Sequence, residues 1–174
     1  SETSSSLPAA TTAVSGAPTS KPVVGRVNSY SGWPSGFTQP IQSSAAVNVN
    51  GIFWIFWPYS AKIVKLDSAT GIMSTVPSIT LGTSLQHLYE GVLVGNSIWL
   101  APWKGSTTVE IDTTTETLTE HNAWPAGFTP GGVHTFTGAV STNDGDVWFM
   151  PSFADRVIKI VVATKQMTGY NSWP

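Results

Sequence analysis

The sequence has no cysteine and few charged residues, which make up 10% of its 174 residues against about 25% in an average soluble domain. The lack of cysteine excludes disulfides, thiolate metal sites and a cysteine nucleophile. The net charge of −2 offers no basic surface to phosphates, so we expect no nucleic-acid partner. No apolar run reaches the about 20 residues that span a bilayer, and we expect no membrane insertion.

Catalytic motifs are missing as well. There is no Gly-x-Ser-x-Gly motif for a serine hydrolase, and no His-x-His or His-Glu-x-x-His motif for a metal. The histidines His87, His121 and His134 lie in different sequence contexts. Asp144 and Asp146 flank a glycine, which favours a solvated hairpin tip over a weak calcium site. We predict no catalytic residue, no metal site and no cofactor, and we favour a protein that is not an enzyme.

What the sequence does contain is a repeat. Read forward without gaps from Trp54, Trp99 and Trp148, apolar residues recur ten and twelve positions on, threonine sixteen on, and methionine or leucine nineteen on. The three tryptophans are 45 and 49 residues apart, a repeat length typical of four-stranded propeller blades. Because they recur at one strand position, we interpret them as core residues.

Each repeat contains four short candidate strands, which predicts an all-β fold. Asn50-Gly51 between apolar runs indicates a hairpin turn. Before the strands of the second repeat, the spacing of Leu85, Leu88 and Tyr89 predicts one helical turn. The expected strands are 45–49, 52–57, 62–67 and 72–76, then 91–94, 98–103, 107–112 and 117–121, and finally 137–141, 147–150, 156–162 and 166–170.

These strands divide the chain into three expected blades, at about 33–78, 79–123 and 124–172. Segment 23–32 is expected to be an extra outer strand, because 25–34 aligns with the last strand of the third repeat. Residues 1–22 form a Ser/Thr/Pro-rich arm that is too poor in large apolar residues to fold alone. We interpret this arm as flexible or surface-wrapping, with an O-glycosylated stalk or a partner-ordered segment as the alternatives.

On these motifs the chain resembles the virginiamycin B lyase-like and NHL-like propellers. Those families repeat an apolar-Trp-Phe strand, an Ile-x-x-Ile-Asp strand and a Thr-Glu-Tyr strand. The resemblance implies propeller architecture from about residue 23 to 174. Lyase members share a His/Glu and magnesium site near the ring axis, which does not map onto this chain, so a propeller lyase stays a distant alternative. The segments that carry the resemblance are 97–100, 109–112, 118–121, 146–149, 156–160 and 166–170.

Three blades are fewer than the about 4 to 8 that close a propeller. The uncovered end faces would expose apolar patches, so we expect the missing neighbours to come from outside the sequence. A second copy related by a two-fold axis would complete a six-bladed ring. The missing blades could equally come from a second polypeptide or from the remainder of a longer chain.

Aromatic side chains near the loops are the best candidates for binding. Trp57, Trp103 and Phe153 follow the repeated tryptophans by three to five residues, next to prolines. Their rings could stack on sugars, contact a partner or pack between blades. A second set lies in the turns between blades and comprises Trp33, Phe37, Trp124 and Phe128.

Two classes of function therefore follow from the sequence. The first is a structural or protein-interaction module that assembles with further blades, and the second is a lectin-like propeller that binds glycans through these aromatic rings. We expect an extracellular or cell-surface location, or alternatively a subunit of a large assembly.

Overall fold

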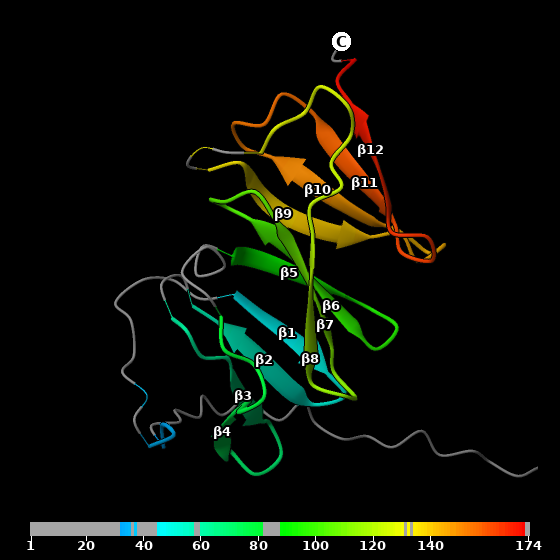
Figure 1. Cartoon of the computed structure of the whole chain (residues 1–174). Coiled ribbons are helices and arrows are strands. Elements are labelled where there is room, and N and C mark those ends of the chain that lie inside the picture. Colours follow the sequence, from blue (N-terminus) through cyan, green and yellow to red (C-terminus); the bar gives the residue numbers. More distant parts are fainter. Residues whose placement is uncertain are drawn as a thin grey trace, which may run out of the picture. The chain divides into compact units, whose positions relative to one another are not determined.

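The computed structural model describes residues 32–35, 37, 45–57, 60–81, 88–130, 132 and 134–172, without the side chain of Tyr89. These residues form twelve strands and no helix, and therefore no helix that could cross a membrane. The strands make three antiparallel sheets of four strands each, which confirms the predicted all-β fold class (Figure 1). The arm at 1–22 and all but the last residue of the expected strand at 23–32 lie outside the described residues.

Each sheet is one blade, and its strands are neighbours in chain order. Blade 1 consists of β1 (Ala45–Val49), β2 (Ile52–Phe56), β3 (Val64–Asp67) and β4 (Met73–Thr75). Blade 2 consists of β5 (Leu88–Val94), β6 (Ser97–Pro102), β7 (Thr108–Asp112) and β8 (Thr117–His121). Blade 3 consists of β9 (Phe136–Ser141), β10 (Val147–Pro151), β11 (Val157–Val161) and β12 (Gln166–Tyr170).

The predicted helical turn before blade 2 is wrong where it can be compared. Leu88 and Tyr89 belong to strand β5, and Leu88 pairs with Pro102 across an irregularity in the register; Leu85 lies outside the described residues. Leu88 is 3% exposed and packs in the core, so burial in a sheet outweighs the helical spacing of the leucines.

The turns use the residue chemistry expected of hairpins. Asn50 and Gly51 both have positive φ, 52° and 88°, as a type I′ turn requires. Asp67 accepts hydrogen bonds from the amides of residues 69 and 70, and Asp112 does the same for residues 114 and 115. These backbone hydrogen bonds lower the pKa of both carboxyls, and they confirm the interpretation of both residues as turn residues.

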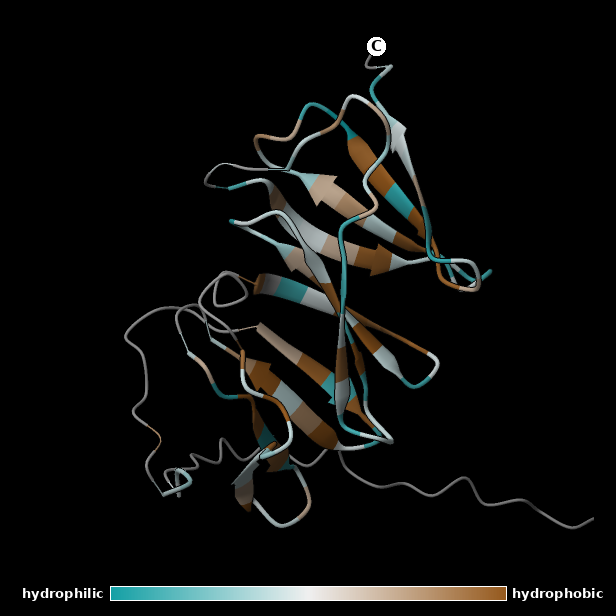
Figure 2. Ribbon diagram, viewed as in Figure 1, coloured by the Kyte–Doolittle hydropathy of each residue, from teal (hydrophilic) through white to brown (hydrophobic). Residues whose placement is uncertain are grey.

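The first strands of the blades, β1, β5 and β9, lie next to one another, and the sheets fan out from them (Figure 1). Gly91 on β5 permits the close approach to β1, because a Cβ atom there would lie 3.2 Å from the Val47 side chain. Figure 2 shows hydrophobic residues concentrated in the strands, where they pack between neighbouring blades.

One apolar core lies between blades 1 and 2 and another between blades 2 and 3. Trp54 belongs to the first core and is 3% exposed, whereas Trp99 belongs to the second and is 0% exposed. Since neighbouring residues of a strand point to opposite faces, each tryptophan lies on the face that its blade turns toward the following blade. Trp148, the third of the series, therefore lies on the face of blade 3 that points away from blade 2, and it is only partly buried.

Candidate functional site

The turns that begin at Trp33-Pro34 and Trp124-Pro125 contain the same backbone hydrogen bond. The amide of Phe37 donates to the carbonyl of Pro34, and the amide of Phe128 donates to that of Pro125, both at 3.0 Å. Gly127 has a φ of 74°, which the third position of such a turn favours. The tight turns predicted from the sequence are thus present at both places.

Four of the predicted binding aromatics belong to these turns, and their rings pack against the blades. The Trp33 and Phe37 rings lie 5.4 and 5.1 Å from the ring of Trp57, which is only 5% exposed. In blade 3 the corresponding rings pack on Phe136, which is fully buried, and the indole of Trp124 donates to the Ser106 carbonyl at 2.6 Å. Packing therefore accounts for most of the surface of these rings.

Trp103 and Phe153 meet in a third cluster, joined by a histidine that the sequence did not indicate. The indole Nε1 of Trp103 donates to Nδ1 of His134 at 2.6 Å, and the two ring centroids are 4.3 Å apart. The ring of Phe153 lies 5.7 Å beyond the histidine and is 78% exposed. Among the predicted aromatics, Phe153 thus presents a large accessible ring.

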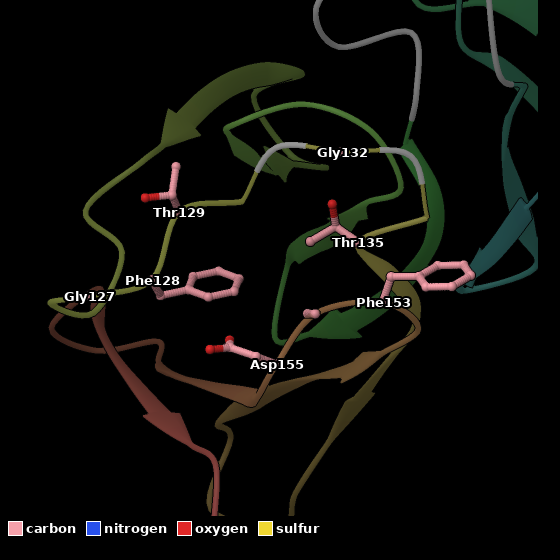
Figure 3. Close-up of a pocket in the computed structure, with 8 residues that line it drawn as sticks. Gly127, Phe128, Thr129, Gly132, Thr135, Phe153 and Asp155 are labelled. Carbon is pink, nitrogen blue, oxygen red and sulfur yellow. The ribbon is translucent and has the colours of Figure 1, made fainter.

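Phe153 also borders a cavity of about 380 Å³ between the loop before β9 and the loop after β10. In Figure 3 the Phe128 ring points toward the middle of the cavity, Phe153 points outward at its edge, and the Asp155 carboxylate lies on the Phe128 side of the cavity. The guanidinium of Arg156 donates to Asp155 at 2.7 and 2.8 Å and lies 5.3 Å from the Phe128 ring. The hydrogen bond from Arg156 lowers the pKa of the Asp155 carboxyl, which is ionised at neutral pH and can accept a hydrogen bond from a ligand hydroxyl.

A larger feature lies on blade 3, on the side away from blade 2. We call it the outer face and define it by Val140, Trp148, Lys159 and Tyr170. Val140 and Tyr170 are 48% and 47% exposed, and the Tyr170 ring stacks on Trp148 at 5.3 Å. Lys159 lies 5.4 Å from the Trp148 ring and pairs with Asp146 at 2.7 Å.

Trp99 of blade 2 shows how the same position looks when a neighbour covers it. His121 stacks on Trp99 at 5.0 Å, as Tyr170 stacks on Trp148. On blade 2, however, apolar residues of blade 3 cover Trp99, and the Lys165 ammonium lies 4.8 Å from the Trp99 ring. Trp99 therefore has no exposed surface. The outer face of blade 3 therefore repeats the ring arrangement that blade 3 covers on blade 2.

Charged residues also connect the blades, at positions that the sequence did not single out. Lys65 of blade 1 pairs with Glu116 of blade 2, and Glu110 of blade 2 pairs with Lys165 of blade 3 at 2.7 Å. Burial opposes ionisation of Glu110, but hydrogen bonds from Lys165, Ser97 and His121 outweigh it and lower the pKa of this carboxyl. At least one ion pair thus connects the blades at each described interface, and at the second interface it belongs to a larger hydrogen-bond network around Glu110.

The described residues contain no group of three or more His, Asp or Glu side chains that could hold a metal ion. His121 and Glu110 do meet, at 2.9 Å. They lie on β8 and β7, the two strands of blade 2 farthest from the first strands, and Glu110 is already engaged by Lys165.

No protein-family model and no curated protein matches the chain. Solved structures do. Virginiamycin B lyase from Staphylococcus aureus matches with a TM-score of 0.55 at 14% identity, over 73% of this chain and 40% of the lyase. The extracellular domain of a one-component-system protein from B. thetaiotaomicron matches with a TM-score of 0.55 at 15% identity, over 75% of this chain and 18% of that one.

A third similar structure is the hydrazine synthase of Kuenenia stuttgartiensis, with a TM-score of 0.53 at 10% identity, over 79% of this chain and 38% of that one. At such identities the matches show the fold alone, and they confirm the propeller-type architecture that the repeat predicts. The chain spans two fifths or less of the length of these structures.

Proposed function

We propose that this chain is a three-blade part of a β-propeller that acts as a non-enzymatic structural and protein-interaction module, and that its outer face receives a further blade. The outer face carries this proposal. Trp148 and Tyr170 repeat the arrangement of Trp99 and His121, yet Tyr170 remains half exposed where the blade 2 surface is covered. Burying such side chains stabilises an interface by about 1.5–3 kcal/mol each.

Light scattering after size exclusion tests whether the outer face binds. We expect the mass to rise above 18.5 kDa with concentration, because a second copy can cover part of the apolar surface. Val140→Asp should weaken this association about tenfold, since a carboxylate would be buried without a partner.

Phe153→Asp is the matched control, because Phe153 is also an exposed apolar residue but lies at the cavity. It should leave the association unchanged. A constant mass of 18.5 kDa that Val140→Asp does not alter would contradict an interaction role for the outer face. A mass of twice this value that persists on dilution would identify a second copy as the completing partner.

A lectin-like function is the second candidate, and the cavity beside Phe153 favours it. An exposed aromatic ring, an ionised carboxylate and the Thr129 and Thr135 side chains along a cavity of about 380 Å³ are the groups that sugar sites combine. The partner would then be a glycan, bound by stacking on Phe153 and by hydrogen bonds to Asp155.

A glycan array at millimolar concentration, followed by titration of any sugar that binds, tests this second candidate. Phe153→Ala should weaken binding about tenfold or more, as loss of an aromatic stacking surface does. Ile72→Ala removes another exposed apolar side chain, outside this cavity, and should bind like the wild type. If no sugar binds, the lectin-like function is excluded.

Two further proposals concern the location of the chain and its alternative role as an enzyme. We propose an extracellular or cell-surface location, which the similarity to an extracellular domain supports, with a large assembly as the alternative. A lyase stays the distant alternative, supported by the fold of the streptogramin-type lyases. An activity of this chain that is lost specifically when magnesium is chelated would revive this alternative.

A further inference from the structure

The ion pairs between blades occupy one repeated position. Glu116 and Lys165 both end the turn between the third and fourth strands of their blade, and both have left-handed backbones with φ of 53° and 61°. Each side chain reaches back to the third strand of the preceding blade, where it pairs with Lys65 or Glu110. These two partners are also equivalent, since they lie in register with Trp54 and Trp99.

The sign of the charges is reversed between the two interfaces. Blade 1 supplies a lysine and blade 2 a glutamate at the first interface, whereas blade 2 supplies a glutamate and blade 3 a lysine at the second. The geometry of the repeat thus fixes the position of the pair. At each interface the later blade carries a charge opposite to that of the blade before it.

The left-handed backbone of Glu116 and Lys165 also indicates that their charged side chains have a function. A left-handed conformation is easy for glycine but strained for other residues. Blade 1 has Gly71 at this place, with φ of 73°. Blades 2 and 3 accept the strain at Glu116 and Lys165, where the side chain gains an ion pair with the neighbouring blade.

Lys159 is the third member of the series on the third strands. It lies in register with Trp148, and its ammonium lies 5.4 Å from that ring, as the Lys65 ammonium lies 5.4 Å from Trp54. Its pairing with Asp146 leaves room for a second partner, because an ammonium has three donors. Glu110 shows this double use, since it binds Ser97 of its own blade as well as Lys165 of the next.

From this series, and resting on the proposed function, we infer that the outer face of blade 3 binds a propeller blade with an acidic residue in the turn between its third and fourth strands. This acidic residue would be the last residue of the turn, where the backbone is left-handed. That carboxylate would pair with Lys159. Blade 1 of a second copy presents Gly71 at this position, which supplies no carboxylate for Lys159. The fitting partner is therefore a different blade.

The test extends the full chain after Pro174 with a second copy of residues 126–172, since Trp173-Pro174 repeats Trp124-Pro125. The added copy carries either the natural Lys165 or the substitution Lys165→Glu. Val140→Cys in the original blade 3 gives the protein its single thiol, because the sequence has no cysteine. The rate at which this thiol is labelled reports how well the added blade covers the outer face.

We expect the added blade with Lys165→Glu to slow labelling about tenfold more than the blade with lysine, because juxtaposed like charges disfavour docking. Lys159→Glu in the original blade should reverse this preference. A second copy of residues 79–123, added in the same way, provides an independent pair, with its own Glu116 compared with Glu116→Lys.

The results separate the inference from the proposed function. Equal protection by added blades of either charge would overturn the acidic partner and leave completion by a further blade intact. If none of the added blades protects the thiol, both the inference and the docking role of the outer face fail. A preference that Lys159→Glu does not reverse would likewise overturn the pairing with Lys159.

Discussion

Trp99→Ala is expected to lower the free energy of unfolding by about 3–5 kcal/mol, the usual cost of truncating a fully buried large aromatic side chain. The Trp99 side chain is 0% exposed and packs in the core between blades 2 and 3. It also carries the stacked ring of His121 and the Lys165 ammonium above its face, so truncation would loosen both blades. Equilibrium unfolding in urea, followed by circular dichroism, measures the change.

Trp148→Ala is the matched control, because Trp148 occupies the same place one repeat later. Its outward face has no blade packed on it within the described residues, and we expect a loss below about 2 kcal/mol. Equal losses for the two variants would contradict the view that the outer face of blade 3 lacks the cover that Trp99 has. In the chain with an added blade that docks, the loss from Trp148→Ala should rise toward that of Trp99→Ala.

The strands could be predicted from the sequence because a repeat supplies the same evidence three times. β1, β8 and β12 have the predicted bounds, and the other strands that were predicted differ at their ends. Leu88 shows the limit of this approach. Its spacing from Leu85 and Tyr89 fits a helix, but the strand it starts depends on blade 1, which comes earlier in the chain and buries the leucine.

The aromatic residues near the loops could be found from the sequence, but their depth could not. Trp57 and Phe153 have similar local contexts, yet they are 5% and 78% exposed. The difference arises because the Trp33 turn packs on Trp57, whereas the Trp124 turn packs on Phe136. Which ring a turn covers depends on loop paths that strand periodicity does not encode.

The ion pairs between blades were missed for a similar reason. Glu110 and Lys165 are separated by 55 residues, and a charged residue on an outer strand is usually solvated. A signal was nevertheless present in the repeat. Glu116 and Lys165 align with Gly71, and two charged residues at a position where the first repeat has glycine indicate that the side chains have a use.

Glu110→Lys is expected to destabilise the chain by roughly 1–3 kcal/mol, because it places two lysines together at a part-buried interface. The double variant with Lys165→Glu should recover at least half of the loss. In the double variant the lysine would lie on the third strand and the glutamate in the turn of the next blade. This is the order of the natural pair between blades 1 and 2, in which Lys65 lies over Trp54 and pairs with Glu116. Lys165→Glu alone should destabilise in the same way, and full additivity of the two losses would exclude a direct pairing.

Acid titration gives an independent readout of the same network. The lowered pKa of Glu110 means that its charge stabilises the folded state fully above the ordinary pKa of a glutamate, about 4.3. This stabilisation is lost as the pH falls through the lower pKa of the folded state. Glu110→Gln cannot titrate, so the difference in unfolding free energy between wild type and variant should be constant near neutral pH and shrink below about pH 4. A difference that stayed constant down to pH 2 would show that the ionised carboxylate of Glu110 does not hold the two blades together.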